Sequence, residues 1–404
     1  MATKNDLFLH ADGDSFFVAC ELVSRPELRG KPVVVGEDRG IAVAMSAEAK
    51  KLGVTRGMPV FEIKKKFPKV IILPHSFGLY REISDKVYEI LLSYMSEVER
   101  YSIDECFAVA TPADIKYAKG AEKFVREIKN EIQDKLGVTY SFGLARTKTL
   151  AKTASKLNKP NGLVVLLNEK DEVSALKKTK VEDVWGIGRK TVPRLLNRAI
   201  MTAYDFVKMD SKQIEKHFSE PLLDLQKELM GEVRSSVESN VDPRDQKSLQ
   251  STATFKPSSS DKEYIWAELS DNVEEACERA RELHLLTKSV SFFVKNTDFI
   301  HREGSAKLSF YSADAGVILN AIEPIFKKVL KKGEMIRSTG ITLHALTKIE
   351  TIPDDLFGNQ KKANEKLVVE EVADRMRAKY GRNAIKHASA LKTAKKNRGN
   401  SFFG

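Results

Sequence analysis

Three acidic residues accompany two apolar segments, in places where a carboxylate needs a compensating partner. Asp12 follows the apolar residues 7–9, and Asp104 and Glu105 lie within 101–109, which has the composition of a strand. Burying a carboxylate costs several kcal/mol unless a cation or hydrogen bonds compensate it. Mg²⁺ prefers oxygen ligands and is commonly held by carboxylates together with substrate phosphates. These acids therefore predict a magnesium site.

The same residues predict two-metal chemistry. Two cations about 3.5–4 Å apart activate a 3′-hydroxyl and neutralise a leaving pyrophosphate in an in-line displacement. Neighbours in a regular strand point to opposite faces, so Asp104 and Glu105 should lie at a bend or hairpin tip from which both converge on Asp12. The alternative interpretation, favoured for any isolated acidic pair, is helix capping or a surface salt bridge.

The length and composition indicate a multidomain protein without membrane spans. The chain has 404 residues, of which 42% are hydrophobic and 30% charged, and no apolar run has the length of a transmembrane helix. The first residues lack the layout of a secretory signal. Cys20, Cys106 and Cys277 are too few and too scattered for a disulfide framework or a zinc site. We expect a cytoplasmic protein, associated with the nucleoid if bacterial.

The charge favours a polyanionic partner. The chain has 67 Lys and Arg against 56 Asp and Glu, a net charge of +11. A surplus of this size makes nucleic acid the leading candidate. The alternative is a basic protein that binds no anion specifically.

Hydrophobic periodicity predicts an α+β first part, rich in βαβ units, and a helical part after Gly162. A further domain has the order β-α-β-β-α-β over residues 250–346. The last part contains an amphipathic helix with Val369, Val372, Ala373, Met376 and Tyr380, and then a basic end. The elements expected in the first part are strands at 7–9, 32–35, 101–109 and 140–143 and helices at 46–52, 79–99 and 120–135.

Several motifs together resemble the successive signatures of Y-family DNA polymerases. They occur in the order and spacing of that family, from about residue 7 to about residue 346. The motifs are Asp12-Gly13-Asp14-Ser15-Phe16-Phe17 with Glu21, Tyr101-Ser102-Ile103-Asp104-Glu105, Ala151-Lys152-Thr153-Ala154-Ser155 and Asn158-Lys159-Pro160-Asn161-Gly162. The resemblance implies a template-directed, low-fidelity DNA polymerase of the lesion-bypass type, which adds dNTPs to a primer 3′ end.

The resemblance also implies a right-hand architecture of palm, fingers, thumb and little finger. The expected divisions are 1–20 and 78–168 for the palm, 21–77 for the fingers, 169–238 for a thumb with a helix-hairpin-helix, 239–249 for a linker, 250–347 for the little finger and 348–404 for a tail.

By position in the motifs, the catalytic and metal-binding residues are Asp12, Asp104 and Glu105. The resemblance implies two Mg²⁺ ions, with Mn²⁺ as a substitute, and the backbone carbonyl of Gly13 as a further ligand. Phe17 matches the steric gate that excludes ribonucleotides by colliding with a 2′-hydroxyl; the alternative is core packing. The residues expected to bind the nucleotide are Phe16, Phe17, Ser46, Lys50 and Lys159.

The fingers depart from the family pattern, because many relatives place a Tyr and an Arg on the triphosphate where this chain has Ala47 and Lys50. Lysine replaces the charge of arginine but not its bidentate fork. Gly13 also departs from the pattern, because a bulky apolar residue is commoner at that position. Small residues such as Ala44, Ser46 and Ala47 imply a roomy site for the nascent base pair.

The expected partners are primer-template DNA and a dNTP. Glycines at a tight turn let backbone N–H groups approach a phosphate, and basic residues on strands follow the DNA backbone. The residues expected to bind DNA are Gly186, Gly188, Arg189, Lys190, Lys295 and Arg337.

A sliding clamp is a further expected partner, through Leu356-Phe357 or Phe402-Phe403. The alternative for either pair is packing on this protein's own surface.

Two other functions stay open from the sequence. Nucleotide cyclases share a two-metal palm with paired acids, but they need no primer-template grip. A catalytically inactive, DNA-binding paralogue should have lost metal carboxylates, whereas all three are present here.

Overall fold

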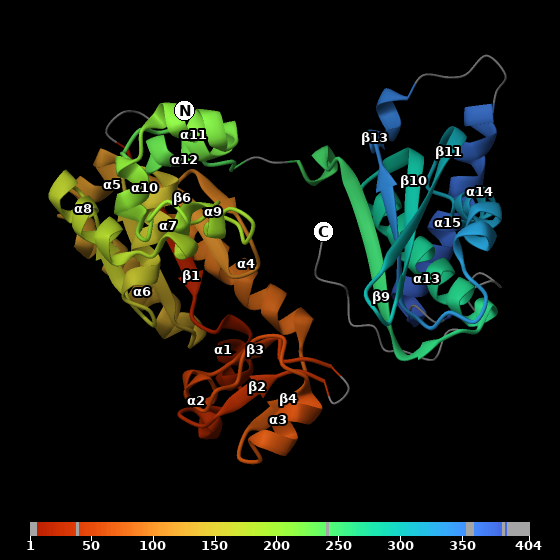
Figure 1. Ribbon diagram of the computed structural model, residues 1–404, viewed down its shortest axis with the longest axis horizontal. Coiled ribbons are helices and arrows are strands. Elements are labelled where there is room, and N and C mark those ends of the chain that lie inside the picture. The colour runs from red at the N-terminus through yellow and green to blue at the C-terminus, as the bar shows by residue number, and fades with distance from the viewer. Residues whose placement is uncertain (1–5, 38–39, 240–241, 353–358, 382–383, 386–404) are drawn as a thin grey trace. The chain divides into compact units, whose positions relative to one another are not determined.

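The computed structural model describes residues 6–37, 40–239, 242–352, 359–381 and 384–385 (Figure 1). The chain divides into two compact units, Met1–Asn240 and Val241–Gly404. Each has its own hydrophobic core, so the predicted α+β multidomain class is confirmed. Among the described helices, none combines the length and the apolar composition that crossing a bilayer requires.

A five-stranded sheet forms the centre of the first unit, in the order β5-β6-β1-β7-β8. All neighbours are antiparallel except β7 and β8, which are parallel. Its strands are β1 (Leu7–Gly13), β5 (Val98–Arg100), β6 (Glu105–Ala110), β7 (Tyr140–Ala145) and β8 (Leu163–Val165).

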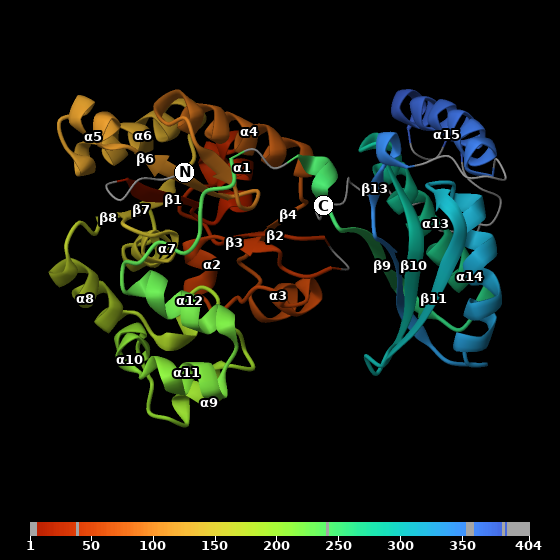
Figure 2. The ribbon, with the colours of Figure 1, turned by 90° about the horizontal axis from the view of Figure 1, so that it is seen from above.

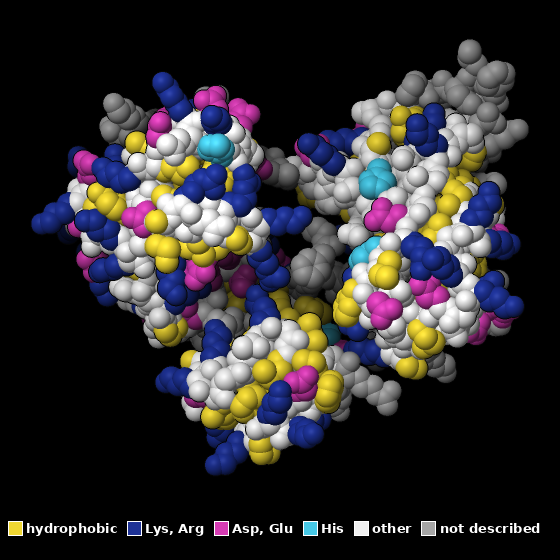
Figure 3. Space-filling model, in the orientation of Figure 1, with side chains coloured by type: hydrophobic (Ala, Val, Ile, Leu, Met, Phe, Trp, Pro, Cys, Tyr) yellow, Lys and Arg dark blue, Asp and Glu magenta, His cyan; other side chains and the backbone are white. Residues whose placement is uncertain are grey.

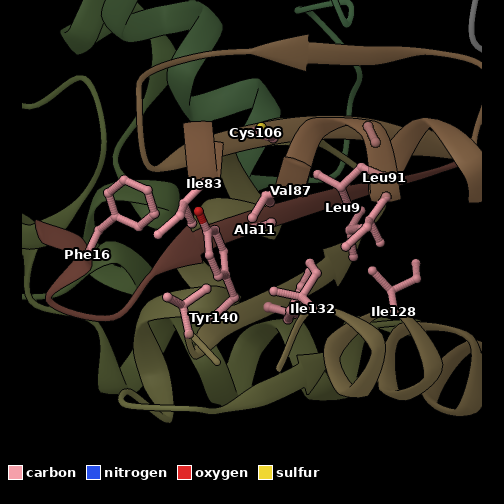
Figure 4. Packing of buried hydrophobic residues seen from close by; sticks show 14 of the residues in the cluster. Leu9, Ala11, Phe16, Ile83, Val87, Leu91, Cys106, Ile128, Ile132 and Tyr140 are labelled. Atoms are coloured by element: carbon pink, nitrogen blue, oxygen red, sulfur yellow. The ribbon is translucent and has the colours of Figure 1, made fainter. Parts of the chain in front are cut away.

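Side chains alternate between the two faces of this sheet. Leu9 and Ala11 pack with residues of α4 (Phe77–Tyr94) and α6 (Ala121–Leu136) on one face (Figure 4). On the other face Phe8 belongs to the cluster that includes α7 (Lys148–Leu157). Figure 2 shows the sheet between α4 and α6 on one side and α7 on the other. Every second residue of β1 therefore faces α7, which fixes the direction of His10 and Asp12.

A small three-stranded sheet, in the order β3-β2-β4, follows β1 and the helix α1 (Phe16–Val23). This sheet and the helices beside it share a small hydrophobic core of their own, which includes Val34, Met45 and Ile63. Its strands are β2 (Val33–Val35), β3 (Ala44–Met45) and β4 (Ile71–Leu73), and its helices are α2 (Ala47–Lys51) and α3 (Val60–Lys66).

The remainder of the first unit is helical, and its apolar residues join the cluster on the α7 face of the sheet. These helices are α8 (Glu169–Lys178), α9 (Val192–Leu196), α10 (Ala203–Lys208), α11 (Ser211–His217) and α12 (Glu220–Leu229). Shorter elements are η1 (Pro26–Leu28), α5 (Pro112–Tyr117) and η2 (Val181–Asp183).

The second unit has a four-stranded antiparallel sheet, in the order β11-β10-β12-β9, with β13 paired to β10. The predicted β-α-β-β-α-β order is confirmed. Its elements are β9 (Ser248–Ser259), α13 (Lys262–Glu282), β10 (Leu285–Asn296), β11 (His301–Ser312), α14 (Ala315–Val329), β12 (Ile336–His344) and β13 (Thr347–Lys348), with the short η3 (Pro243–Asp245) and η4 (Ile349–Thr351).

The predicted last helix is present as α15 (Asn359–Tyr380), but the expected apolar face is not its packing face. Val369 and Tyr380 are 69% and 61% exposed. Instead, the buried Arg281 of α13 donates to both carboxylate oxygens of Asp374, at 2.6 and 2.8 Å. Leu367 adds the apolar contact.

Two predicted elements were too long. The strand expected over 101–109 begins only at Glu105, because residues 101–104 form a bend in which the backbone N–H groups of Tyr101 and Ser102 both donate to the Glu105 carbonyl, each at 3.0 Å. The helix expected over 79–99 stops at Tyr94, because Met95 has an extended backbone conformation.

Candidate active site

The two strands that carry the predicted acids are hydrogen-bonded neighbours. Asp12 of β1 lies directly opposite Glu105 of β6 in the antiparallel register, and both side chains are on the α7 face of the sheet. Asp104 belongs to the preceding bend, where its backbone carbonyl accepts a 2.9 Å hydrogen bond from the Gly13 N–H. Ser102 Oγ donates to the Asp104 carboxylate at 2.7 Å. The bend thus holds Asp104 next to the end of β1.

The structure gathers two of the three acids with an unexpected third group. One ligand atom each of His10, Asp12 and Glu105 lies within 4.8 Å of the others. Asp104 is not part of this group. The carboxylate oxygens suit a hard divalent cation, and an imidazole nitrogen suits a transition metal. The two carboxylates of this group supply the oxygen ligands that the predicted Mg²⁺ prefers.

Two lysines neutralise the paired acids. Lys152 Nζ lies 2.9 Å from both carboxylate oxygens of Glu105, and Lys159 donates to Asp12 Oδ1. Lys152 belongs to α7, whose residues Lys148, Lys152 and Lys156 recur every four residues. This spacing puts the three ammonium groups along one face of the helix.

Burial shifts the pKa values of two side chains in the site. The pKa of Glu105 is raised, mainly because the carboxyl group is desolvated, whereas the neighbouring Lys152 lowers it. His10 is fully buried, and its pKa is well below the usual range because of desolvation and then because of the positive charge of Lys152. Its Nδ1 lies 2.8 Å from Ser155 Oγ, while Nε2 has no hydrogen-bond partner.

Aromatic rings enclose the Lys152 ammonium group. Its Nζ is 4.3 Å from the centroid of Tyr101, 5.3 Å from that of Trp185 and 5.7 Å from that of Phe107. Such rings stabilise a cation when water is excluded. Lys152 lies within a family motif, but the sequence predicted no role for it, because its partner Glu105 belongs to a strand far away in the chain.

Asp14 has a different role from Asp12, although the two are separated by one residue. Its carboxylate accepts hydrogen bonds from Ser141 Oγ at 2.8 Å and from the Asn161 backbone N–H at 2.7 Å. Asp14 therefore holds the segment that contains Lys159 against the sheet. A Cβ at Gly13 would lie 2.9 Å from the Phe16 ring, which explains why a small residue stands between the two acids.

The expected gate residue Phe17 is part of an aromatic stack. Its ring is 4.5 Å from that of Tyr80 with an angle of 13° between the planes, and Phe77 contacts it edge-on at 6.1 Å. Tyr80 Oη donates to the buried carboxylate of Glu21 at 2.7 Å. Phe16, by contrast, is a core residue.

Helix α2 holds Lys50 near the turn that follows β1. Lys50 Nζ lies 3.5 Å from Ser15 Oγ, in the turn between β1 and α1, and Ala47 is exposed beside it on α2. Ser46 is buried and caps α2, accepting from the Ala49 N–H at 3.2 Å and donating to the Lys31 carbonyl at 3.0 Å. The side-chain contacts of Ser46 are thus to backbone.

The residues expected to bind DNA lie in both units. Gly186 adopts a left-handed conformation in the turn before α9, and Gly188, Arg189 and Lys190 are exposed there. In the second unit, Lys295 and Arg337 flank the Phe299 ring. Figure 3 shows Lys and Arg side chains on both units. The pairs Leu356-Phe357 and Phe402-Phe403, expected to bind a clamp, lie outside the described residues.

Two family models match the chain. Residues 11–156 match the impB/mucB/samB family, and residues 246–356 match the C-terminal domain of the same family. A DNA polymerase IV of Desulfatibacillum aliphaticivorans is 29% identical over 96% of this chain and 98% of its own length. Protein UmuC of Salmonella typhimurium is 30% identical over 94% of this chain and 92% of its own.

Solved structures share the fold. A Y-family DNA polymerase chimera of Dbh and Dpo4 has a TM-score of 0.72 at 23% identity, over 85% of this chain and 99% of that chain. An insertion ternary complex of Dbh DNA polymerase has a TM-score of 0.55 at 23% identity, with the same coverage.

Proposed function

Because this chain belongs to the impB/mucB/samB family, and so to the Y-family DNA polymerases, we propose that it extends a DNA primer with dNTPs by two-metal nucleotidyl transfer. It is a DNA-directed DNA polymerase of the translesion type. The observation that carries the mechanism is the pairing of Asp12 with Glu105 across β1 and β6. One ligand atom of each acid and one of His10 lie within 4.8 Å of one another.

The divalent cations would be held by Asp12, Asp104 and Glu105, with the Gly13 carbonyl as a further ligand. Bound Mg²⁺, or Mn²⁺ in its place, would supply activation of the primer 3′-hydroxyl and neutralisation of the leaving pyrophosphate. The close approach of the Asp12 and Glu105 carboxylates supports this assignment, because oxygen ligands placed together suit a hard divalent cation.

Lysines beside the acids bind the triphosphate. Lys159 reaches Asp12, and Lys50 reaches the turn at Ser15, so both ammonium groups are close to the end of β1. An ammonium group attracts phosphate as a point charge. Lys152 contacts Glu105 instead of the triphosphate. Aromatic rings surround its ammonium group, whose two 2.9 Å contacts with the Glu105 carboxylate oxygens hold that carboxylate in place.

Phe17 discriminates between sugars. Phe17 follows the Asp12–Ser15 segment in the chain, and its ring stacks on the ring of Tyr80. A 2′-hydroxyl on an incoming nucleotide would collide with this ring. The hydrogen bond to Glu21 holds Tyr80 in place. Tyr80 therefore prevents the Phe17 ring from moving away from the 2′-hydroxyl.

Primer-template DNA and a dNTP are the proposed partners, and the ternary complexes among the structural neighbours support them. The proposed palm comprises 1–20 and 78–168, the fingers 21–77, the thumb 169–238 and the little finger 250–347, with 239–249 as linker and 348–404 as tail. Clamp binding through Leu356-Phe357 or Phe402-Phe403, and a cytoplasmic location, stay predictions.

Primer extension tests the proposal. Asp104→Ala should abolish extension of a primed template while leaving DNA affinity within a few fold, since the aspartate acts on cations rather than on DNA. Asp134→Ala, an exposed acid on α6, is the matched control and should extend normally. Full extension by Asp104→Ala would contradict the metal assignment, and cyclic nucleotide products from the unmodified protein would indicate a cyclase.

A further inference from the structure

A hydrogen bond between two aromatic side chains joins the helical part of the first unit to the bend that carries Asp104. The indole Nε1–H of Trp185 donates to Tyr101 Oη at 3.0 Å. The two rings meet edge to face, with their centroids 5.5 Å apart and an angle of 86° between their planes. Tyr101 begins the bend, whereas Trp185 lies in the turn before α9, 84 residues further along the chain.

Main-chain hydrogen bonds make the bend a stiff connection between Tyr101 and Asp104. The Tyr101 N–H donates to the Glu105 carbonyl at 3.0 Å, and the Gly13 N–H donates to the Asp104 carbonyl at 2.9 Å. Ser102 Oγ donates to the Asp104 carboxylate at 2.7 Å. Because the bend is short and internally bonded, a shift of the Tyr101 side chain would displace the carboxylate of Asp104.

Trp185 is itself held in place from two sides. Its ring lies 5.6 Å from that of Phe107 of β6, with an angle of 32° between the planes. Lys156 of α7 donates from Nζ to the carbonyl of Asp183 at 3.0 Å, just before the tryptophan in the chain. The indole donor therefore has a defined position relative to both β6 and α7.

Tyr101, by contrast, depends on this bond for its position. It is 43% exposed, so packing alone leaves its side chain room to move. The indole N–H is only a donor, and the Tyr101 hydroxyl is the acceptor that the structure provides for it. The Tyr101 ring also lies 4.3 Å from Lys152 Nζ, which contacts Glu105 at 2.9 Å. A displaced Tyr101 would thus disturb the surroundings of both acids.

We infer that Trp185 and Tyr101 are positioning residues for nucleotidyl transfer. Their hydrogen bond holds Asp104 and Glu105 in the geometry that receives the cations. The inference rests on the proposed function and deepens it, because it gives the helical part of the first unit a direct share in shaping the metal site. Neither aromatic side chain has to touch the nucleotide or the DNA for this effect.

The test compares Tyr101→Phe with Trp185→Phe, which remove the acceptor and the donor of the same bond and each retain an aromatic ring. Each change should lower kcat in single-nucleotide extension by about threefold to tenfold, the factor expected for one hydrogen bond. The affinity for primer-template DNA, measured by fluorescence anisotropy, should stay within a few fold. The double variant should be no slower than the slower single variant, because the second change removes nothing further.

Manganese binding gives a readout that does not depend on turnover. Mn²⁺ is titrated into the complex of the full chain with primer-template DNA and a non-hydrolysable dNTP, and free Mn²⁺ is measured by electron paramagnetic resonance. Both single variants should bind Mn²⁺ more weakly by about threefold or more, because the ligands are less well placed. A bond that served stability alone would lower the melting temperature and leave the Mn²⁺ affinity unchanged.

Tyr94→Phe and Trp266→Phe are the matched controls. Tyr94 Oη donates to Glu131 at 2.6 Å on the α6 side of the sheet, away from the acids, and Trp266 packs on Phe326 in the second unit. Both variants should match the unmodified protein in kcat and in Mn²⁺ affinity.

Unchanged kcat and Mn²⁺ affinity in Tyr101→Phe and Trp185→Phe, or losses that add up in the double variant, would overturn the inference. Failure of the proposed function is a separate outcome, because in that case the unmodified protein itself would not extend a primer.

Discussion

The ring of Phe17 lies flat against the ring of Tyr80, 4.5 Å away and inclined by only 13°. Tyr80 is fully buried, and its hydroxyl group donates at 2.7 Å to Glu21, which is 1% exposed. The pKa of Tyr80 is raised by its burial and by this hydrogen bond, so the hydroxyl stays a donor. Phe17, the proposed gate residue, is thereby fixed by a residue of the core.

Phe17→Ala should admit ribonucleotides, because the collision with the 2′-hydroxyl disappears. The measurement is the ratio of kcat/KM for a dNTP to that for the matching rNTP in single-nucleotide extension. We expect this ratio to fall by at least tenfold, while dNTP incorporation continues. An unchanged ratio would remove Phe17 from the gate.

Tyr80→Ala should weaken the same discrimination although Tyr80 does not touch the sugar, because the Phe17 ring gains space behind it. Tyr80→Phe retains the stacking surface and loses only the bond to Glu21, so its dNTP to rNTP ratio should lie between those of the unmodified protein and Tyr80→Ala. Circular dichroism checks that both variants fold. Equal ratios in all three proteins would mean that the stack serves stability alone.

Removing the ammonium group at Lys152 should move the acidic limb of the pH–rate profile to higher pH. Burial already raises the pKa of Glu105 and Lys152 opposes this effect, so Lys152→Gln should raise that pKa further. Cation binding requires the carboxylate, which is lost as the pH falls through the pKa. A higher Mg²⁺ concentration should shift the limb back.

The control for this experiment is Lys123→Gln, which removes an exposed ammonium group paired with Glu127 on α6. Its profile should coincide with that of the unmodified protein. If Lys152→Gln also shows an unshifted limb, then Lys152 does not set the protonation of Glu105.

Replacing Ala47 and Lys50 of α2 by the Tyr and Arg that are commoner in the family should strengthen binding of the triphosphate. Ala47 and Lys50 are both exposed, so the larger side chains of Ala47→Tyr with Lys50→Arg meet no core residue. A phenol hydroxyl and a bidentate guanidinium add hydrogen bonds to phosphate. The KM for dNTP should fall severalfold in steady-state extension, whereas Lys50→Ala should raise it. A KM unaffected by either change would place the triphosphate away from α2.

Much of the fold could be predicted from the sequence, because the strands of the second unit and the helices around the first sheet follow simple apolar periodicity. The acids at 12, 104 and 105 were recognisable from their motifs. The roles of His10 and Lys152 were not, because they depend on α7 lying across β1 and β6, a contact between segments far apart in the sequence. For the same reason, no local pattern indicated that Asp14 binds the Asn161 backbone or that Tyr80 supports Phe17.

The most direct test of the central claim is anomalous diffraction from crystals of the full chain with primer-template DNA, a non-hydrolysable dNTP and Mn²⁺. We predict two anomalous peaks within coordination distance of side-chain oxygens of Asp12, Asp104 and Glu105. Well-ordered DNA and nucleotide with the manganese peaks elsewhere, or with only His10 and solvent as ligands, would contradict the two-metal assignment.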